Sequence, residues 1–472
     1  MPFILPKSSN LPPAINMLNR IYRKQFINMK KSMEIGKAYR NKVPRTTLSE
    51  MNKRNSDVDP ISIFHYSSKD RLPSLFPVRA ERMAESPFRF FRGVPELMLM
   101  DLIWTNQTGL LQQICGDAHL LNFRGFASRE RTLLFGINDF DESMTGPFEW
   151  DIKRLATSIF IAGHVIGLDS ASCSETVYSM LDSYINYLKK SLDLSPLEQW
   201  YRFYSAEDIL DRIADDDLVN KKERMIAKEL RKTPATLLEK MTVRNPGSPF
   251  STFKEIKPLM WKPSGDDPFQ HKVDEFFNNY RRTVSWNFRM LFDRYRFSDL
   301  TMRVVGVGSV GTRTALALFE DGEHDHPLIL QMKEADASIF SNYFGNRFKH
   351  QGQRVIRGQT LMQSSSDIFL GWATDPTEGR HYYVRQFRDM KVKAEVEDMD
   401  ASFLMAYAKS CGFALGDAHV RGGNAGMIMG YTGDGHSFKD AIVQFASAYA
   451  ERNNKDYDLF LETYKKGKLM MD

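Results

Sequence analysis

The chain has 472 residues, of which 42% are hydrophobic and 26% are charged, an ordinary composition for a globular protein with a sizeable core. The formal net charge of +5 is small for this length and does not indicate a nucleic-acid partner. Three cysteines, odd in number and far apart, argue against a disulfide framework and favour a cytoplasmic location. No apolar run approaches the roughly 18 residues of a membrane span, so we expect no span.

The first part of the chain predicts a loose start and a basic helix whose charges most simply face solvent. It leads into the segment S-P-F-R-F-F-R-G at residues 86–93, whose aromatic side chains are expected to pack. Arg92 beside Gly93 is a candidate phosphate ligand, because a guanidinium group matches phosphate oxygens in a bidentate fork. An ordinary ion pair is an equally good interpretation of Arg92.

The stretch C-G-D-A-H-L-L-N-F, followed by N-D-F-D-E, carries the most informative chemistry. Gly116 allows a tight bend before Asp117. An apolar strand at residues 133–137 is predicted to direct Asp139 out of its end. Phosphoryl transfer needs one carboxylate to orient the attacking hydroxyl, and an Asn with a second carboxylate to hold Mg²⁺. The spacing D-x-x-x-x-N followed by D-F-D is that of kinase catalytic and metal loops.

A core helix is predicted from Glu149 to Ile166 by the recurrence of apolar residues. Asp151 on this helix either holds the catalytic loop by hydrogen bonds or is an ordinary helix residue, and both interpretations stay open. Residues 174–300 are expected to form further helices with a loop rich in Pro, Gly and Ser at 246–268. Nothing in this region names a ligand.

A second group of motifs begins near residue 303. A G-x-G-x-x-G segment is followed by two apolar runs joined by a turn, which predicts a glycine loop and two strands, the second carrying a lysine. Kinases cover and pin the ATP phosphates in this way. A dinucleotide fold is a weaker interpretation, because there the motif should open a helix. The candidate phosphate contacts are Gly306, Gly308, Ser309, Gly311, Arg313 and Lys333.

Strands expected at residues 368–372 and 381–387, with a helix at 348–365, complete a small sheet domain. An amphipathic helix at 401–419 ends in G-D-A-H, the same four letters as in the catalytic motif. This second copy has no Asn five residues after Asp417. We therefore interpret it as a helix end beside the site.

Both halves of a kinase site are thus predicted, but in reversed order along the chain. A circular permutation resolves this, because a site depends on where residues lie in space and domain termini often lie close together. The sequence predicts an α+β, protein-kinase-like bilobal fold that is circularly permuted. We expect a basic helical extension at 1–85, a helical lobe with the catalytic and metal loops at 86–300, a small antiparallel-sheet lobe at 301–395, and C-terminal helices packing on the helical lobe at 396–472.

With these motifs the chain resembles a bacterial family catalogued as domain of unknown function 2252 (DUF2252), over about residues 35–460. The resemblance also includes V-G-V-G-S-V-G-T-R, L-Q-M-K-E-A, S-D-I-F-L-G-W and Y-V-R-Q-F-R-D-M-K. More distantly, the chain is similar to aminoglycoside and choline kinase-like phosphotransferases through G-D-x-H-x-x-N and D-F-D. That likeness implies ATP and Mg²⁺ as cofactors. It implies Asp117 as the base with His119 in support, and a metal held by Asn122, Asp139 and Asp141.

One feature of such kinases is not evident. The lysine that binds phosphate normally pairs with an acidic residue on the following helix, but Arg357 stands near the position where this family has a Glu. Glu334 is next to Lys333 on a predicted strand and is expected to point to the opposite face.

Three functions are compatible with these motifs. The first is an Mg²⁺- and ATP-dependent phosphotransferase, or an AMP transferase, acting on an unidentified small-molecule or protein hydroxyl. The second is a kinase-like module that binds nucleotide without chemistry. The third and least favoured is a metal-dependent phosphoesterase built from Asp117, His119, Asp139 and Asp141, which would leave the glycine motif and Lys333 unused.

Overall fold

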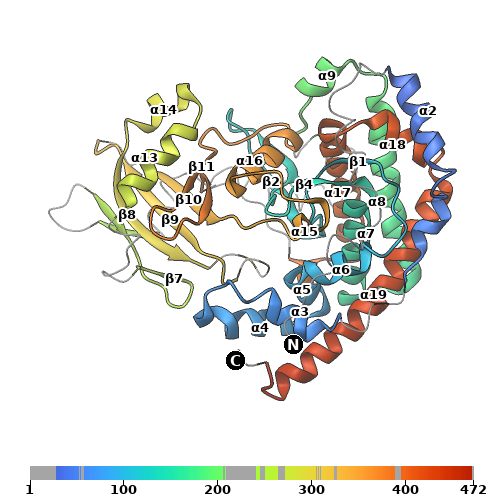
Figure 1. Ribbon diagram of the computed structural model, residues 1–472, viewed down its shortest axis with the longest axis horizontal. Helices are drawn as coiled ribbons and strands as arrows, with labels where there is room; N and C mark the ends of the chain where they lie inside the picture. The colour runs from blue at the N-terminus through green and yellow to red at the C-terminus, as the bar shows by residue number, and fades with distance from the viewer. Residues whose placement is uncertain are drawn as a thin grey trace.

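The structure is an α+β arrangement of helices and small antiparallel sheets. In Figure 1 the strands of the largest sheet lie on one side of the molecule and the long helices α7, α8, α17 and α19 lie on the other. The computed structural model describes residues 28–52, 54, 58–205, 208, 241–244, 250–263, 272–304, 306, 308, 310–323, 327–387 and 395–469.

The largest sheet has six antiparallel strands in the order β11-β12-β10-β9-β8-β7. The predicted pair of strands after the glycine motif is confirmed as β9 and β10, both buried along nearly their whole length. Lys333 lies opposite Thr314 on β9 and Tyr383 on β12. The strands are β7 (Met260–Trp261), β8 (Arg296–Arg303), β9 (Thr314–Glu320), β10 (Leu328–Glu334), β11 (Gly371–Thr374) and β12 (His381–Gln386).

Before residue 304 the structure contains strands where helices and a loop were expected from the sequence. The helix prediction is wrong for β5 (Thr242–Arg244) and β8, and the predicted loop at 246–268 contains β6 (Ser251–Phe253), which pairs with β5, and β7. A buried strand needs hydrogen-bond partners on both edges, and β8 supplies them on the edge of β9 that β10 leaves open. The helices expected between residues 209 and 240 lie outside the described residues.

Two helices pack on the outer face of this sheet, α13 (Val273–Thr283) and α14 (Trp286–Phe292). Their aromatic side chains recur at helical spacing and meet the strands, so that the ring centres of Phe277 and Phe319 are 4.9 Å apart. The sheet lobe was expected to begin at residue 301. These two helices come before that residue in the chain, and they share a hydrophobic core with the sheet.

The main hydrophobic core lies among the long helices. Nearly every residue of α7 is buried, as expected for a helix surrounded by others. α17 approaches α8 closely at Gly416, where a β-carbon would lie 3.0 Å from Cβ of Tyr187. The helices of this part are α2 (Met29–Tyr39), α7 (Phe148–Val165), α8 (Ser170–Ser191), α9 (Pro196–Tyr201), α17 (Ala401–Gly422), α18 (Ala425–Thr432) and α19 (His436–Lys465).

Short helices near the start of the described chain pack against the end of α19, where the rings of Phe64 and Phe460 are 5.1 Å apart. They are α3 (Pro60–Tyr66), α4 (Phe76–Ala84), α5 (Pro87–Gly93) and α6 (Pro95–Leu102). The chain then forms β1 (Leu111–Ile114), the 3₁₀ turn η5 (Leu120–Asn122), β2 (Phe123–Ala127), β3 (Leu133–Ile137) and β4 (Met144–Pro147).

Two pairs of antiparallel strands, β1 with β4 and β2 with β3, frame the predicted catalytic and metal loops. The later helices α15 (Ser341–Phe344) and α16 (Gln351–Met362) lie between the large sheet and the long helices (Figure 1). Within the described part of the chain, no helix combines the length and the hydropathy needed to cross a bilayer.

Candidate functional site

The tight bend before the predicted base is held by Asp151 on α7. Gly116 has a φ of +84°, a conformation that side chains rarely adopt. The fully buried carboxylate of Asp151 accepts hydrogen bonds of 2.9 Å from the backbone N–H groups of Cys115 and Gly116. Of the two roles considered for Asp151, the structure supports the one in which it holds the catalytic loop.

Residues of the second G-D-A-H motif contribute to this support. Nε2 of His419 on α17 lies 3.4 Å from Oδ2 of Asp151, and its Nδ1 contacts the hydroxyl of Tyr184 at 2.8 Å. Asp417 instead accepts hydrogen bonds from Tyr187 and Arg421. The prediction that this motif is a helix end beside the site is therefore confirmed.

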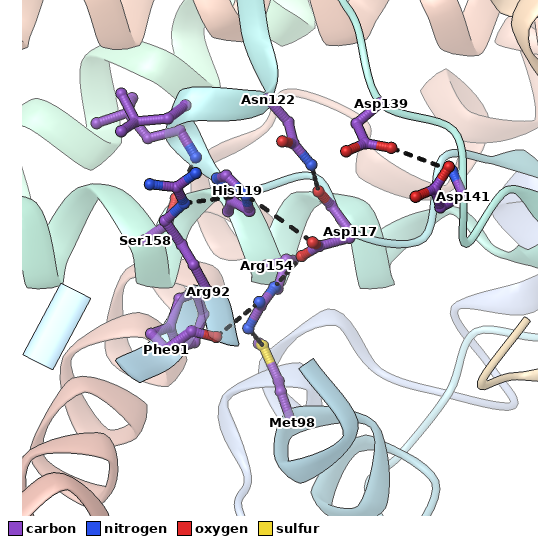
Figure 2. A network of polar contacts seen from close by, with 12 residues as sticks. Phe91, Arg92, Met98, Asp117, His119, Asn122, Asp139, Asp141, Arg154 and Ser158 are labelled. Atoms are coloured by element: carbon purple, nitrogen blue, oxygen red, sulfur yellow. Dashed lines mark hydrogen bonds and ion pairs between the residues drawn. The ribbon is translucent and has the colours of Figure 1, made fainter. Parts of the chain in front are cut away.

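Asp117 is positioned by Arg154, one turn along α7 from Asp151 (Figure 2). Nε of Arg154 donates to Oδ1 of Asp117 at 2.8 Å, and its Nη2 donates to the carbonyl oxygen of Phe91 at 2.9 Å. Burial raises the pKa of Asp117, and Arg154 opposes this shift because its charge stabilises the carboxylate. The Asp117 side chain keeps 21% of its surface exposed, so it stays accessible to a ligand.

His119 is buried beside Asp117, with its Nε2 3.9 Å from Oδ2 of that residue. Nε of Arg92 donates to Nε2 of His119 at 3.3 Å, so in the neutral ring the proton belongs on Nδ1. Burial and the charge of Arg92 hold the pKa of His119 well below its usual value. Nδ1 has no hydrogen-bond partner among the described residues.

The predicted metal ligands come together at the end of β3. Nδ2 of Asn122 donates to the carbonyl oxygen of Asp117 at 2.6 Å, which fixes the amide beside the base. Oδ1 of Asp139 accepts from the backbone N–H of Asp141 at 3.3 Å. Figure 2 shows Asp139 and Asp141 on one side of Asp117 and Arg92 on the other.

Lys333 on β10 reaches the same carboxylates. Its Nζ lies 3.9 Å from Oδ2 of Asp139 and donates a hydrogen bond to Oδ2 of Asp141. The other oxygen of Asp141 accepts from the hydroxyl of Tyr383 at 2.8 Å. Burial alone would lower the pKa of Lys333, but Asp139 and Asp141 raise it above its usual value. The segment with Asp139 and Asp141 and the strand with Lys333 are far apart in sequence, and they meet at one cluster of charged side chains.

The acidic partner of Lys333 comes from the predicted metal loop and not from the helix that follows the lysine. Glu334 points to the other face of β10, as predicted, and accepts from Arg380 at 2.7 Å. α16 presents Arg354, which donates to the carbonyl oxygen of Ser143 at 2.9 Å. The guanidinium of Arg357 lies over the ring of Phe348.

The G-x-G-x-x-G motif of Gly306, Gly308 and Gly311 is called the glycine segment here. Residues that the sequence did not single out hold it in place. Nη1 of Arg71 donates to the carbonyl oxygens of Gly308 and Val310, both at 2.7 Å. The backbone N–H of Leu72 donates to the carbonyl oxygen of Gly311 at 2.8 Å. A β-carbon at Gly308 would lie 3.2 Å from the carbonyl oxygen of Arg92, so this loop approaches the last turn of α5.

The remaining predicted phosphate contacts are placed differently. Gly306 is exposed. Ser309 lies outside the described residues. Nη1 of Arg313 is 3.2 Å from the carbonyl oxygen of Asp70 and 3.4 Å from Oε2 of Glu334. The structure therefore pairs Arg313 with Glu334, on the opposite face of β10 from Lys333.

The oxygen groups at the end of β3 suit Mg²⁺ that shares its coordination with phosphate. Mg²⁺ is commonly bound by one or two carboxylates, with waters and substrate phosphates completing the shell. The side chains of Asp139 and Asp141 are 37% and 31% exposed, and no described residue donates to Oδ1 of Asn122. Within the described residues, no three or more His, Cys, Asp or Glu side chains are grouped to hold a metal ion, as a dinuclear phosphoesterase would need.

Several residues of this site carried no strong signal in the sequence. Arg154 and His419 lie on helices, and an apolar helical pattern does not show which polar side chain points inward. The repeated G-D-A-H did mark the position of His419. Arg71 stands in an irregular segment, between α3 and α4. Arg124 on β2 and Arg385 on β12 add positive charge that lowers the pKa of Asp139, after the larger effect of Lys333.

No similar curated protein and no similar solved structure was found. A family described as "Uncharacterized protein conserved in bacteria (DUF2252)" matches residues 71–463. The matched residues include Asp117, Asp139, the glycine segment, Lys333 and α17. They make up well over half of the chain. The chain therefore belongs to the DUF2252 family.

Proposed function

We propose that this protein is an Mg²⁺- and ATP-dependent phosphotransferase that acts on a hydroxyl group. The observation that carries the proposal is the 3.9 Å separation between Nζ of Lys333 and Oδ2 of Asp139. A strand lysine next to two partly exposed carboxylates is an arrangement that binds the phosphates and the metal of a nucleotide together. A structural ion pair would not require the carboxylates to keep a third of their surface exposed.

Each residue has a role in this proposal. Asn122, Asp139 and Asp141 would hold Mg²⁺, which supplies neutralising charge to the phosphates when it is bound. Lys333 exchanges its contact with Asp141 for a contact with phosphate oxygens. Asp117 orients the acceptor hydroxyl and accepts its proton, while Arg154 favours the charged form of the carboxylate and fixes its direction.

The glycine segment covers the phosphates from the sheet side. Its backbone approaches Arg92 at the end of α5, and Lys333 of β10 reaches Asp139, so the proposed nucleotide lies between the large sheet and these two segments. We further propose that the fold is a permuted kinase-like one, in which the large sheet and the long helices are the two lobes. The packing of α3 on the end of α19 supports this, because a permutation requires early and late segments of the chain to lie close together.

The test is Mg²⁺-dependent ATP turnover by the purified full chain, with the products separated by chromatography. Asp139→Ala and Lys333→Met are each expected to lower turnover by roughly a hundredfold or more. Lys439→Met is the matched control, because Lys439 pairs with the exposed Asp182 at 2.6 Å on a distant surface. It should keep full turnover.

The products also distinguish the alternatives. ADP indicates phosphoryl transfer or hydrolysis, whereas pyrophosphate indicates transfer of AMP. Binding of a non-hydrolysable ATP analogue with no turnover under any condition would instead support the nucleotide-binding module. Absence of both binding and turnover would overturn the proposal entirely.

A further inference from the structure

Two guanidinium groups near Asp117 have donors that no protein group uses. Arg92, in the last turn of α5, donates only through Nε to His119. Arg124 on β2 donates only through Nε, to the carbonyl oxygen of Leu121 at 2.6 Å. Among the described residues, no hydrogen-bond acceptor or carboxylate contacts Nη1 or Nη2 of either side chain.

These charges are not balanced by the acids around them. Burial lowers the pKa of Arg92 to about 10, and the next largest cause is the like charge of Arg124. Asp117 and Glu395 both act on Arg92 but neither forms an ion pair with it, and Oδ1 of Asp117 already accepts from Arg154. Burial, and after it the charges of Arg92, Arg154 and Arg124, lowers the pKa of His119 well below its usual value. An anion would therefore be stabilised strongly here.

The carbonyl oxygen of Arg92 lies beside the glycine segment, but its side chain turns to His119, away from the two carboxylates of the proposed nucleotide site. Figure 2 shows Arg92 and His119 on one side of Asp117, with Asp139 and Asp141 on the other. Phosphates held by Lys333 and a metal ion lie on the side of the two carboxylates. An anion at Arg92 thus approaches Asp117 from the side where an acceptor hydroxyl has to enter.

A phosphate group matches the free donors better than a carboxylate does. Each arginine offers its two Nη groups, and two forks can contact three oxygens of one dianionic phosphate. A monoanionic carboxylate would leave one guanidinium charge without compensation.

We propose that Arg92 and Arg124 form an anion subsite that binds a phosphate group on the acceptor, so that the substrate is a phosphomonoester carrying a free hydroxyl. This inference rests on the proposed function, because it takes Asp117 as the residue that faces the acceptor. It assigns Arg92 to the acceptor and not to the nucleotide.

The test is calorimetric titration of the full chain with inorganic phosphate, which needs no turnover. The Arg92→Gln, Arg124→Gln double variant is expected to bind phosphate about tenfold more weakly or worse, since two charge-assisted contacts are lost. Arg129→Gln is the matched control, because Arg129 is exposed and contacts only its neighbour Glu130. Acetate should bind the wild type far more weakly than phosphate.

Two further titrations separate the acceptor subsite from the nucleotide site. Lys333→Met should bind phosphate within about twofold of the wild type, and saturation with Mg²⁺ and a non-hydrolysable ATP analogue should not displace phosphate. Unchanged phosphate affinity in the double variant would overturn the inference, and so would displacement by the analogue or no binding to the wild type. If the double variant does not fold, Arg124→Gln alone serves, with about a threefold loss expected.

The two proposals fail in different ways. Phosphate binding that depends on Arg92 and Arg124 without any ATP turnover would leave the anion subsite intact and count against the phosphotransferase. ATP turnover that is sensitive to Asp139→Ala, without phosphate binding at Arg92, would support the phosphotransferase and count against the anion subsite.

Discussion

Nη1 of Arg71 lies 2.7 Å from the carbonyl oxygen of Gly308, so a residue that precedes α4 holds the glycine segment of the large sheet. The same nitrogen also donates to the carbonyl oxygen of Val310. Two backbone carbonyls of one loop are thus fixed by one guanidinium. The conformation of the loop depends on this contact and not only on its glycines.

Replacing Arg71 by Ala is expected to loosen the glycine segment. Loss of the contacts to two carbonyl oxygens should raise the hydrogen-exchange rate of peptides from residues 310–320 by roughly tenfold, because each such bond contributes about 1 kcal/mol. Exchange measured by mass spectrometry checks this without any assumption about function. Arg129→Ala, at an exposed position, should leave the same peptides unchanged. Equal exchange in the two variants would show that the contact is dispensable.

Two glycines with the same backbone conformation allow the bend before Asp117 to be tested. Gly116 and Gly167 both have a φ of +84°. A β-carbon at Gly116 would lie 2.5 Å from the carbonyl oxygen of Glu142, whereas at Gly167 it would meet nothing within 4 Å. Gly167→Ala should cost about 1 kcal/mol in the free energy of unfolding, which is the conformational term alone.

Gly116→Ala should cost about 3 kcal/mol, because a steric conflict with backbone is added to the conformational term. Urea denaturation followed by circular dichroism measures both values. Similar costs for the two variants would mean that the loop moves to accommodate the methyl group.

Asp151→Asn tests how far the catalytic loop depends on a buried carboxylate. An amide has one acceptor oxygen, so one of the N–H groups of Cys115 and Gly116 would lose its partner. The expected loss in the free energy of unfolding is about 2–3 kcal/mol. Asp182→Asn on the exposed face of α8 should change stability by less than about 0.5 kcal/mol. Comparable urea midpoints for both variants would contradict this account.

Glu142 makes stability depend on pH. Burial raises its pKa to about 7, while Arg354 acts in the opposite direction. The folded state therefore binds more protons than the unfolded state between pH 4.5, the usual value, and pH 7. Stability contributed by the protonated carboxyl is present at low pH and is lost as the pH rises through 7.

Glu142→Gln removes this titration and should keep the acceptor for the N–H of Ile339. Its stability relative to the wild type is expected to increase by about 1–3 kcal/mol between pH 5 and pH 8. Urea denaturation at four pH values measures the difference. Glu451→Gln, at an exposed position, should show no such trend. A difference that stays constant with pH would be inconsistent with a raised pKa at Glu142.

Much of the local structure could be predicted because it depends on short sequence patterns. The two apolar runs and the turn between them predicted the hairpin of β9 and β10, and the apolar run at residues 133–137 predicted β3. The strand period also placed Glu334 and Lys333 on opposite faces. The meeting of Lys333 with Asp139 was predicted from chemistry, because a lysine and carboxylates of these motifs are the groups that bind nucleotide phosphates and their metal.

Other features could not be predicted, since they depend on contacts between distant segments. β8 is a strand because β9 leaves an edge to be paired, and no local pattern shows this. Arg71 contacts Gly308 across 237 positions of the chain. The sequence showed no acidic partner for Lys333 on the helix after it, and the partner in the structure, Asp141, lies 192 positions earlier in the chain.

The support of Gly116 by Asp151, and of Asp151 by His419, has a consequence for biosynthesis. His419 is near the end of the chain, and the helix that carries it is made long after the loop that it stabilises. A nascent chain on the ribosome would hold an incomplete loop until α17 has emerged and docked. Products of premature termination would then expose a buried carboxylate and its apolar surroundings, which makes them substrates for chaperones and proteases.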